Sequence, residues 1–203
     1  MVVFQALTWE ARDTDEEHLI SIFGKTEDGK SVCVTTSFEP YFFVKLPRGT
    51  TQQDVKILFN ELNRLRENCV TSYSLTRQKD VWGFQNNEEF NYMHLNFKTL
   101  ETRRKINSLF MYNNEFKKYH VYESNLDPVL RLMHRTGIQS TGWLDTGSSC
   151  VRSHLAKVDI DLWCNDWTTL NPVSRDDIAP FVVASVDIEC NSSTGKFPDA
   201  DIP

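Results

Sequence analysis

Alternation of apolar and polar positions dominates the N-terminal part of the chain, and this pattern is typical of half-buried β-strands. Segments 2–9, 18–24 and 31–36 carry it. The second and third segments flank Gly29, and glycine readily adopts the positive φ that a tight hairpin turn requires. The pattern therefore predicts a β-hairpin region over residues 1–37.

Farther along, short apolar strands alternate with segments of helical spacing, such as the one in which Val55, Leu58 and Leu62 recur. The predicted order is strand 41–46, helix 50–69, strand 70–77, strand 90–97, helix 100–112 and strand 119–122. That order is the split βαβ arrangement of ferredoxin-like domains, which RNA-recognition modules share. We therefore expect an α+β fold with a ferredoxin-like (RNA-binding-like) βαββαβ unit over residues 38–122.

Residues 123–180 are predicted to connect this unit to a second domain. Asp127 and Gly137 can cap the two ends of a helix. The predicted elements are a helix over 125–137, a loop over 144–156, a strand over 155–163 and an irregular segment over 165–180. Because that last segment holds two prolines, we place the boundary there. Residues 1–180 then form an N-terminal domain, and residues 181–203 begin a second one.

The composition is that of a folded chain with an acidic C-terminal part. Of 203 residues, 40% are hydrophobic and 25% charged, which excludes disordered and collagen-like chains. No apolar stretch approaches the roughly 20 residues of a membrane span, and the N-terminus lacks the basic lead of a targeting peptide. The formal net charge is −6, and residues 155–203 carry three basic and nine acidic residues. This region is unsuited to binding phosphate but suited to binding cations.

The cysteines show no metal-binding spacing, because no two of the five lie close enough in sequence to form a knuckle. They are Cys33, Cys69, Cys150, Cys164 and Cys190. Without an export signal, we expect reduced thiols and an intracellular location.

Two triplets of acid, isoleucine and acid occur, at residues 159–161 and 187–189. Residues two apart in a strand point to the same side, so each triplet sets two carboxylates side by side. The first pair, Asp159 and Asp161, falls on the polar face of an ordinary half-exposed strand with Lys157 nearby. We therefore expect the first triplet to be structural.

The second triplet ends an apolar strand. One face of segment 182–188 is wholly apolar, and the other becomes acidic only at Asp187 and Glu189. Such a strand is predicted to be buried on both faces, with its carboxylates at the carboxyl end, where open α/β sheets place their sites. Paired carboxylates suit hard divalent cations and so suggest metal-assisted phosphoryl transfer or phosphodiester hydrolysis. The alternative is a solvated strand end.

Nucleic-acid binding is a competing interpretation of the βαββαβ unit. Tyr92 and His94 share a strand face and could stack on bases, while Arg103, Arg104 and Lys105 could contact phosphate. The strand lacks the glycine and the basic residue of RNA-recognition modules, which favours a packed sheet with a solvated helix face. The alternative function is thus a stand-alone single-stranded nucleic-acid-binding module with an RNA-recognition-like fold.

The acidic strand end also resembles a known motif. Residues 183–190, followed by 195–200, resemble the first exonuclease motif of family B DNA polymerases, in particular the delta-like group that includes replicative polymerases of large DNA viruses. Other segments resemble the same family in order, at 38–44, within 122–143 and at 178–180. The resemblance therefore spans nearly the whole chain.

This resemblance implies an N-terminal domain with an RNA-binding-like fold, followed by the first strand of an RNase H-like α/β 3′→5′ exonuclease domain. By the same resemblance Asp187 and Glu189 are the catalytic residues and hold two divalent ions, Mg²⁺ or Mn²⁺, which activate water and stabilise the leaving 3′ oxygen. Phe197 falls where the family places an aromatic near the 3′ terminal base. Anchoring its loop beside Pro198 is an equal alternative.

The implied protein is a DNA-directed DNA polymerase that proofreads. Its expected partners are a DNA primer-template, dNTPs and a sliding clamp, without a membrane, in the nucleus or at a viral replication site. The palm motifs and later exonuclease carboxylates of the family are missing, so we expect the chain to be an amino-terminal portion, inactive alone. A complete small metal-dependent nuclease is a third interpretation. It would need Asp159, Asp161 or Asp199 to join the metal pair.

Overall fold

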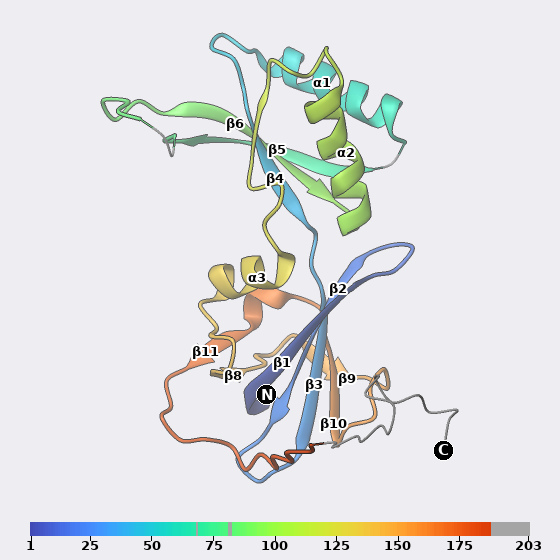
Figure 1. The fold of residues 1–203 in the computed structure, drawn as a ribbon, viewed down its shortest axis with the longest axis vertical. Coiled ribbons are helices and arrows are strands. Elements are labelled where there is room, and N and C mark those ends of the chain that lie inside the picture. The colour runs from blue at the N-terminus through green and yellow to red at the C-terminus, as the bar shows by residue number, and fades with distance from the viewer. Residues whose placement is uncertain (68, 81–82, 188–203) are drawn as a thin grey trace, which may run out of the picture.

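The residues that the structure describes form two β-sheets of different size (Figure 1). The structure is a computed structural model that describes residues 1–67, 69–80 and 83–187. The larger sheet has seven strands in the order β11-β8-β1-β2-β3-β10-β9, in which only β3 and β10 pair in parallel. Its strands are β1 (Val3–Asp13), β2 (His18–Lys25), β3 (Ser31–Ser37), β8 (Trp143–Asp145), β9 (Cys150–Arg152), β10 (Ile160–Cys164) and β11 (Asn171–Val173).

The predicted N-terminal hairpin is confirmed as the β2–β3 pair, and its turn contains Gly29 with a φ of +84°. β1 pairs with the other side of β2 and is longer than predicted, since it extends to Asp13. A one-residue irregularity lies between Ala6 and Thr8 of β1. Gly24 sits opposite this irregularity, where an added Cβ would lie 2.0 Å from a backbone oxygen of β1. Only glycine therefore fits at that position.

The smaller sheet has four antiparallel strands in the order β5-β6-β4-β7. Helices α1 and α2 cover one of its faces, because apolar side chains of both pack into one core with β4 and β6. The chain order is β4, α1, β5, β6, α2, β7. The bounds are β4 (Tyr41–Lys45), α1 (Gln52–Leu65), β5 (Val70–Gln78), β6 (Phe90–Phe97), α2 (Leu100–Tyr112) and β7 (His120–Tyr122). The predicted mixed α+β, strand-rich composition is confirmed.

Capping residues define where the helices begin and end. Thr51 and Thr99 each accept a hydrogen bond from the third residue of their helix, and a side chain of that residue bonds back to them. The helix α3 (Pro128–Thr136) begins after Asp127, whose carboxylate accepts two backbone N–H bonds, and ends at Gly137 with a φ of +74°. Both ends of α3 therefore match the prediction.

Two predicted elements are shorter than expected. The helix predicted over 50–69 ends at Leu65, because Arg66 turns to an extended conformation. The strand predicted over 155–163 begins only at Ile160, since the N–H groups of residues 155 and 156 are bonded to a carboxylate instead of to a neighbouring strand. The predicted loop over 144–156 contains the short strand β9 and most of β8. In the part of the chain that the structure describes, no helix is long and apolar enough to cross a membrane.

The two sheets meet through a small apolar cluster and a polar contact. Ile20, Phe38, Tyr41 and Leu132 form the cluster, which connects β2, the β3–β4 linker, β4 and α3. The short 3₁₀ turn η1 (Trp167–Thr169) also packs against it. This arrangement makes the chain between β3 and β4 part of a buried junction.

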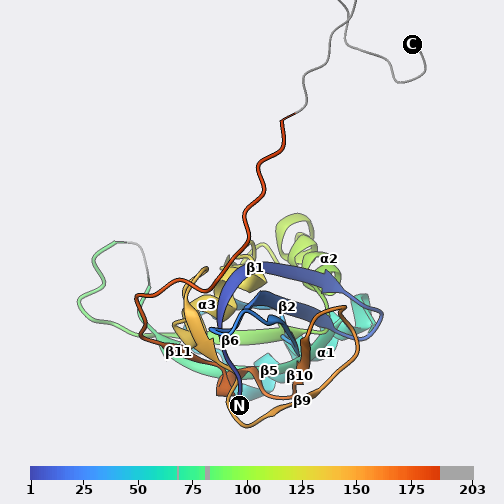
Figure 2. The ribbon, with the colours of Figure 1, turned by 90° about the horizontal axis from the view of Figure 1, so that it is seen from below.

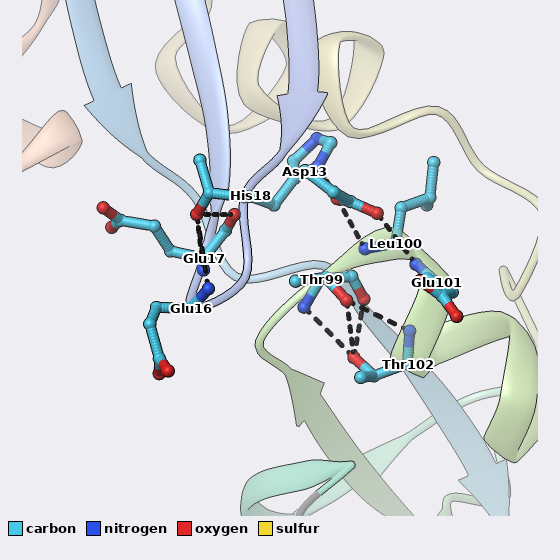
Figure 3. A network of polar contacts seen from close by, with 9 residues as sticks. Asp13, Glu16, Glu17, His18, Thr99, Leu100, Glu101 and Thr102 are labelled. Carbon is cyan, nitrogen blue, oxygen red and sulfur yellow. Dashed lines mark hydrogen bonds and ion pairs between the residues drawn. The ribbon is translucent and has the colours of Figure 1, made fainter.

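The polar contact places an acid of the larger sheet at the start of α2 (Figure 3). The Asp13 carboxylate accepts N–H bonds from Leu100 at 2.9 Å and from Glu101 at 3.0 Å, and it lies 2.6 Å from Nδ1 of His18. Burial raises the pKa of Asp13, but the hydrogen bonds from Leu100, His18 and Glu101 outweigh it and hold that pKa below its ordinary value of 3.8. A negative charge at a helix N-terminus is favourable, so this contact stabilises the junction.

Candidate functional site

The segment that leads to the second acidic triplet is attached firmly to the larger sheet. β11 pairs with β8, and the Arg175 guanidinium lies 4.0 Å from the ring centroid of Trp143. Arg175 also pairs with Asp177 and Glu27, and these hydrogen-bonded carboxylates raise the pKa of its guanidinium above the ordinary value. The indole N–H of Trp143 donates to the backbone oxygen of Asp177 at 2.8 Å. The chain therefore has a defined path up to this point.

The last attachment is at Ala179 and Pro180. The Ala179 N–H donates to the side-chain oxygen of Gln5 in β1 at 2.7 Å, and its side chain is buried. The Lys25 ammonium lies 3.4 Å from the Pro180 oxygen. Beyond Pro180, residues 181–187 run away from the body of the molecule (Figure 2). Asp187, the first candidate acid, thus lies eight residues after Ala179, which is bonded to the first strand.

The prediction of a buried strand before the second triplet is corrected by the described part of that segment. Residues 181–187 form no strand, and all but Phe181 are exposed, including Val182 and Val186 at 89% and 83%. The physical reason is that an apolar strand needs a neighbouring sheet to pair with and to cover it, and no described strand lies beside this segment.

The predicted site residues are therefore not brought together in the described structure. Asp187 is exposed, and no hydrogen bond or ion pair joins its carboxylate to another described residue. Glu189 and Phe197 lie outside the described residues. Among the residues that are described, no three His, Cys, Asp or Glu side chains form a group that could hold a metal. Metal binding by the predicted carboxylate pair stays a prediction. It is based on chemistry, because two carboxylates supply the hard oxygen donors that fit Mg²⁺ or Mn²⁺.

The first triplet has a different environment, and its prediction as structural agrees with the contacts. Asp161 is buried, and its Oδ2 accepts N–H bonds from Leu155 at 2.5 Å and Ala156 at 3.0 Å. The Asp159 carboxylate accepts from the N–H and the hydroxyl of Ser31, at 2.8 and 2.7 Å, and these bonds lower its pKa. Two details differ from the prediction. Asp161 is buried instead of half-exposed, and backbone N–H groups, instead of Lys157, are the partners of its carboxylate.

The candidate base-stacking face is filled by the protein's own side chains. Tyr92 is buried, with its ring 5.7 Å from that of Tyr122. His94 lies edge-on to Tyr41 at 4.4 Å and stacked on Phe43 at 4.9 Å. Burial, followed by the nearby arginine charges of α3, lowers the pKa of His94, so its neutral form is favoured. The rings of Tyr92 and His94 are thus already in contact with other rings of the protein, which does not favour their stacking on single-stranded bases.

The three basic residues of α2 differ in their availability for phosphate. Arg103 is buried and donates to the Leu126 oxygen at 2.7 Å, so it is part of the core. Lys105 pairs with Glu101 at 2.6 Å on the helix surface. Arg104 is exposed. The helical periodicity of the sequence could not distinguish them. The buried arginine donates a hydrogen bond to a carbonyl oxygen in a loop that is distant in sequence, and periodicity does not report such contacts.

The comparisons with known proteins point to one family. A model described as "DNA polymerase family B, exonuclease domain" matches residues 119–203. The chain is 29% identical to a DNA polymerase of Paramecium bursaria Chlorella virus NY2A, over 100% of this chain and 22% of that protein. It is 31% identical to the DNA polymerase of Pyramimonas orientalis virus, over 96% of this chain and 18% of that protein.

A cellular relative and a solved structure agree with the viral ones. The chain is 26% identical to the DNA polymerase delta catalytic subunit of Dictyostelium discoideum, over 90% of this chain and 19% of that protein. Its fold resembles the family B DNA polymerase from the hyperthermophilic archaeon Pyrobaculum calidifontis, with a TM-score of 0.66, 15% identity and coverage of 88% of this chain and 21% of that one. The chain thus spans about a fifth of the length of these relatives.

Proposed function

Because the chain corresponds in sequence and fold to the N-terminal and exonuclease region of family B DNA polymerases, we propose that it serves as the amino-terminal portion of a DNA-directed DNA polymerase with a 3′→5′ exonuclease. The observation that carries the proposal is coverage. The alignment with the Chlorella virus DNA polymerase extends over 100% of the chain and so includes both sheets and the acidic segment, and the family model also reaches residue 203. A stand-alone nucleic-acid-binding module would be expected to match mainly over residues 38–122.

The geometry also weakens that alternative. The sheet face that would receive bases is occupied by packed aromatic rings, and Arg103 is buried in the core. Residues 1–154 carry balanced charge in the sequence, whereas nucleic-acid binding draws most of its affinity from basic residues. We therefore propose that the smaller sheet mainly braces the catalytic body of the polymerase.

We further propose that residues 38–122 form a ferredoxin-like unit and that the N-terminal domain ends at residue 180. The strand order β5-β6-β4-β7, with both helices on one face, supports the first part. The contrast near Pro180 supports the second, since the chain is attached to the larger sheet up to that residue and residues 182–187 are exposed. On this proposal residues 181–203 open the exonuclease domain.

In the proposed exonuclease, Asp187 and Glu189 would hold two Mg²⁺ or Mn²⁺ ions. When bound, such ions activate a water and stabilise the leaving 3′ oxygen of a phosphodiester. The two carboxylates supply the hard oxygen donors that the ions require. Phe197 would stack on the 3′ terminal base. The attachment of Ala179 to Gln5 would hold the start of this segment in place relative to the larger sheet.

The partners proposed for the full polymerase are a DNA primer-template and dNTPs, with a sliding clamp as a further one because delta catalytic subunits are among the relatives. The proposed location is the nucleus or a viral replication site, in keeping with the viral and eukaryotic relatives.

The experiment is made in the polymerase that carries this region. Asp187→Ala combined with Glu189→Ala should reduce removal of a mismatched 3′ nucleotide to background, while extension of a matched primer persists. Asp176→Ala, at an exposed acid near the domain boundary, is the matched control and should leave both activities unchanged. Unaltered mismatch removal in the double variant would refute the site assignment.

The 203-residue chain itself is proposed to lack both activities. Incubation with Mg²⁺ and an end-labelled primer should leave the primer at its original length, with or without a template and dNTPs. Stepwise shortening of the primer would contradict this and would support a complete small nuclease.

A further inference from the structure

Two cysteines of the larger sheet lie directly opposite each other. Cys150 of the edge strand β9 is paired with Cys164 of β10 in the antiparallel register. Cross-strand partners point to the same face, and both side chains pack against the core of the larger sheet. The four described cysteines are free thiols, and the other two, Cys33 and Cys69, lie in different strands and loops. The pairing of β9 with β10 therefore brings one pair of thiols together.

The hydrogen-bond pattern shows which kind of pair this is. Ser153 N–H donates to the Asp161 oxygen at 2.9 Å, and Asn165 N–H donates to the Ser149 oxygen at 3.2 Å. Hydrogen-bonded and non-hydrogen-bonded pairs alternate along an antiparallel ladder. Cys150 and Cys164 follow directly after the bonded 149/165 pair, so they form a non-hydrogen-bonded pair.

That position has the spacing a disulfide needs. In non-hydrogen-bonded pairs the Cα atoms are about 4.5 Å apart, and disulfides span Cα separations of roughly 4.4–6.8 Å. A bond between the two sulfurs would require little movement of either strand. It would close a loop of about 15 residues that includes the turn between β9 and β10.

The two sulfurs are also close enough for one to hydrogen-bond to the other. Sγ of Cys150 lies 3.2 Å from the Thr146 oxygen, and Sγ of Cys164 lies 3.2 Å from the Asp166 oxygen. A hydrogen bond between the two sulfurs lowers the pKa of Cys164 and raises that of Cys150. Cys164 is fully buried, whereas Cys150 is half-buried on the edge strand, so solvent reaches the pair from the β9 side.

We propose that Cys150 and Cys164 are an oxidation site that forms an intramolecular disulfide when the protein meets a peroxide. One sulfur, as thiolate, attacks a peroxide oxygen and becomes a sulfenic acid as hydroxide leaves. The other sulfur attacks the sulfenic sulfur, and a second hydroxide leaves. The two thiol protons neutralise both hydroxides, so two thiols and one hydrogen peroxide give one disulfide and two waters.

The consequence of the bond is local. β9 is a three-residue strand at the edge of the sheet, and its single neighbour in the sheet is β10. The bond would hold this edge in place, and a thiol reductant would release it. The chain would thereby contain a disulfide that forms and is reduced reversibly, outside the proposed exonuclease segment.

The test uses the 203-residue chain with Cys190→Ser, which removes the cysteine that lies outside the described residues. Hydrogen peroxide should reduce the thiol count from four to two, lower the mass by two hydrogen atoms and join the peptides that contain Cys150 and Cys164. The unfolding midpoint should rise by roughly 5 °C and return on reduction. Cys69→Ser in the same background is the matched control and should not alter the cross-link.

Three results would overturn the proposal. They are four thiols remaining after peroxide treatment, conversion of either cysteine to a sulfinic acid without a cross-link, or a cross-link of Cys150 or Cys164 to a different cysteine. Because the peptide mapping is done on a chain that retains both residues, the test does not depend on whether a Cys150→Ser or Cys164→Ser variant folds. Failure here would leave the proposed exonuclease site unaffected, since that site is tested by mismatch removal.

Discussion

The two acid–isoleucine–acid triplets look alike in the sequence, but their described acids have different surroundings. In the first, Asp161 is buried against two backbone N–H groups and Asp159 is bonded to Ser31. In the second, Asp187 is exposed and has no bonding partner among the described residues. In each acid of the first triplet, Oδ2 already accepts two hydrogen bonds from the protein. The comparison therefore gives the first triplet a structural role. In the second triplet, the Asp187 carboxylate is not engaged by a described residue and could bind a metal.

The largest expected effect is at Asp161. Asp161→Ala removes the acceptor of the Leu155 and Ala156 N–H groups inside the protein and should lower the free energy of unfolding by about 2–3 kcal/mol. Chemical denaturation at pH 7 measures this. Asp161→Asn keeps an acceptor oxygen and is the matched control, with a smaller loss. If the alanine variant lowers the free energy of unfolding by less than about 0.5 kcal/mol, Asp161 does not have the structural role that the comparison gives it.

Asp13 is a partly exposed carboxylate that, like Asp161, accepts hydrogen bonds from two backbone N–H groups. Asp13→Ala should lower the free energy of unfolding by about 1 kcal/mol at pH 7, because the N–H groups of Leu100 and Glu101 lose their acceptor. The folded-state pKa of Asp13 is below 3.8, so its contribution is present above that pH and is lost as the pH falls through the folded value.

Denaturation of the wild type and the Asp13→Ala variant between pH 7 and pH 2 checks this prediction. The two stability curves should converge at the acid end. A gap that stays constant down to pH 2 would show that the effect is packing instead of charge.

A smaller effect is expected at Asp159, which lies at the surface and bonds to Ser31. Asp159→Ala should lower the unfolding midpoint by less than Asp161→Ala does. Its pKa is lowered by the Ser31 bonds, so this contribution is also present above pH 3.8 and disappears as the carboxylate protonates. In a double-mutant cycle with Ser31→Ala, the two changes should be non-additive. Full additivity would mean that the bond from the Ser31 hydroxyl to the Asp159 carboxylate contributes nothing.

The smallest expected effect on stability is at Asp187. Asp187→Ala in the 203-residue chain should leave the unfolding midpoint within about 1 °C of the wild type, because its carboxylate contacts no other described residue. Differential scanning calorimetry measures this, with Ser185→Ala as the matched exposed control. A clear loss of stability would show that Asp187 is structural, and the contrast between the triplets would disappear.

Local signals in the sequence were sufficient for most of the smaller sheet. The helix predicted over 100–112 has the observed bounds, and Asp127 and Gly137 cap α3 as expected. These features depend on side chains that bond to backbone within a few residues, so periodicity and capping residues contain the information. The same holds for the β2–β3 hairpin, whose turn residue is a neighbour of both strands.

Features that depend on distant partners could not be predicted. Nothing near Asp161 in sequence indicates that β10 pairs in parallel with β3, or that Cys164 lies opposite Cys150. β11 contains Pro172, and a proline is typical of a loop. The proline is tolerated here because β11 is an edge strand. The strand pattern suggested a metal-binding pair and the family resemblance assigned it to Asp187 and Glu189, but neither could place the pair, since no described strand lies beside Asp187.

The parallel pairing of β10 with β3 has a consequence for synthesis on the ribosome. Thr36 and Cys164 are hydrogen-bonded although 128 residues separate them, and the whole smaller sheet lies between them in the chain. The nascent polypeptide can therefore complete the smaller sheet while β3 still presents an open edge that awaits β10. We expect aggregation during translation to concentrate in that interval, and a pause before residue 160 to prolong it.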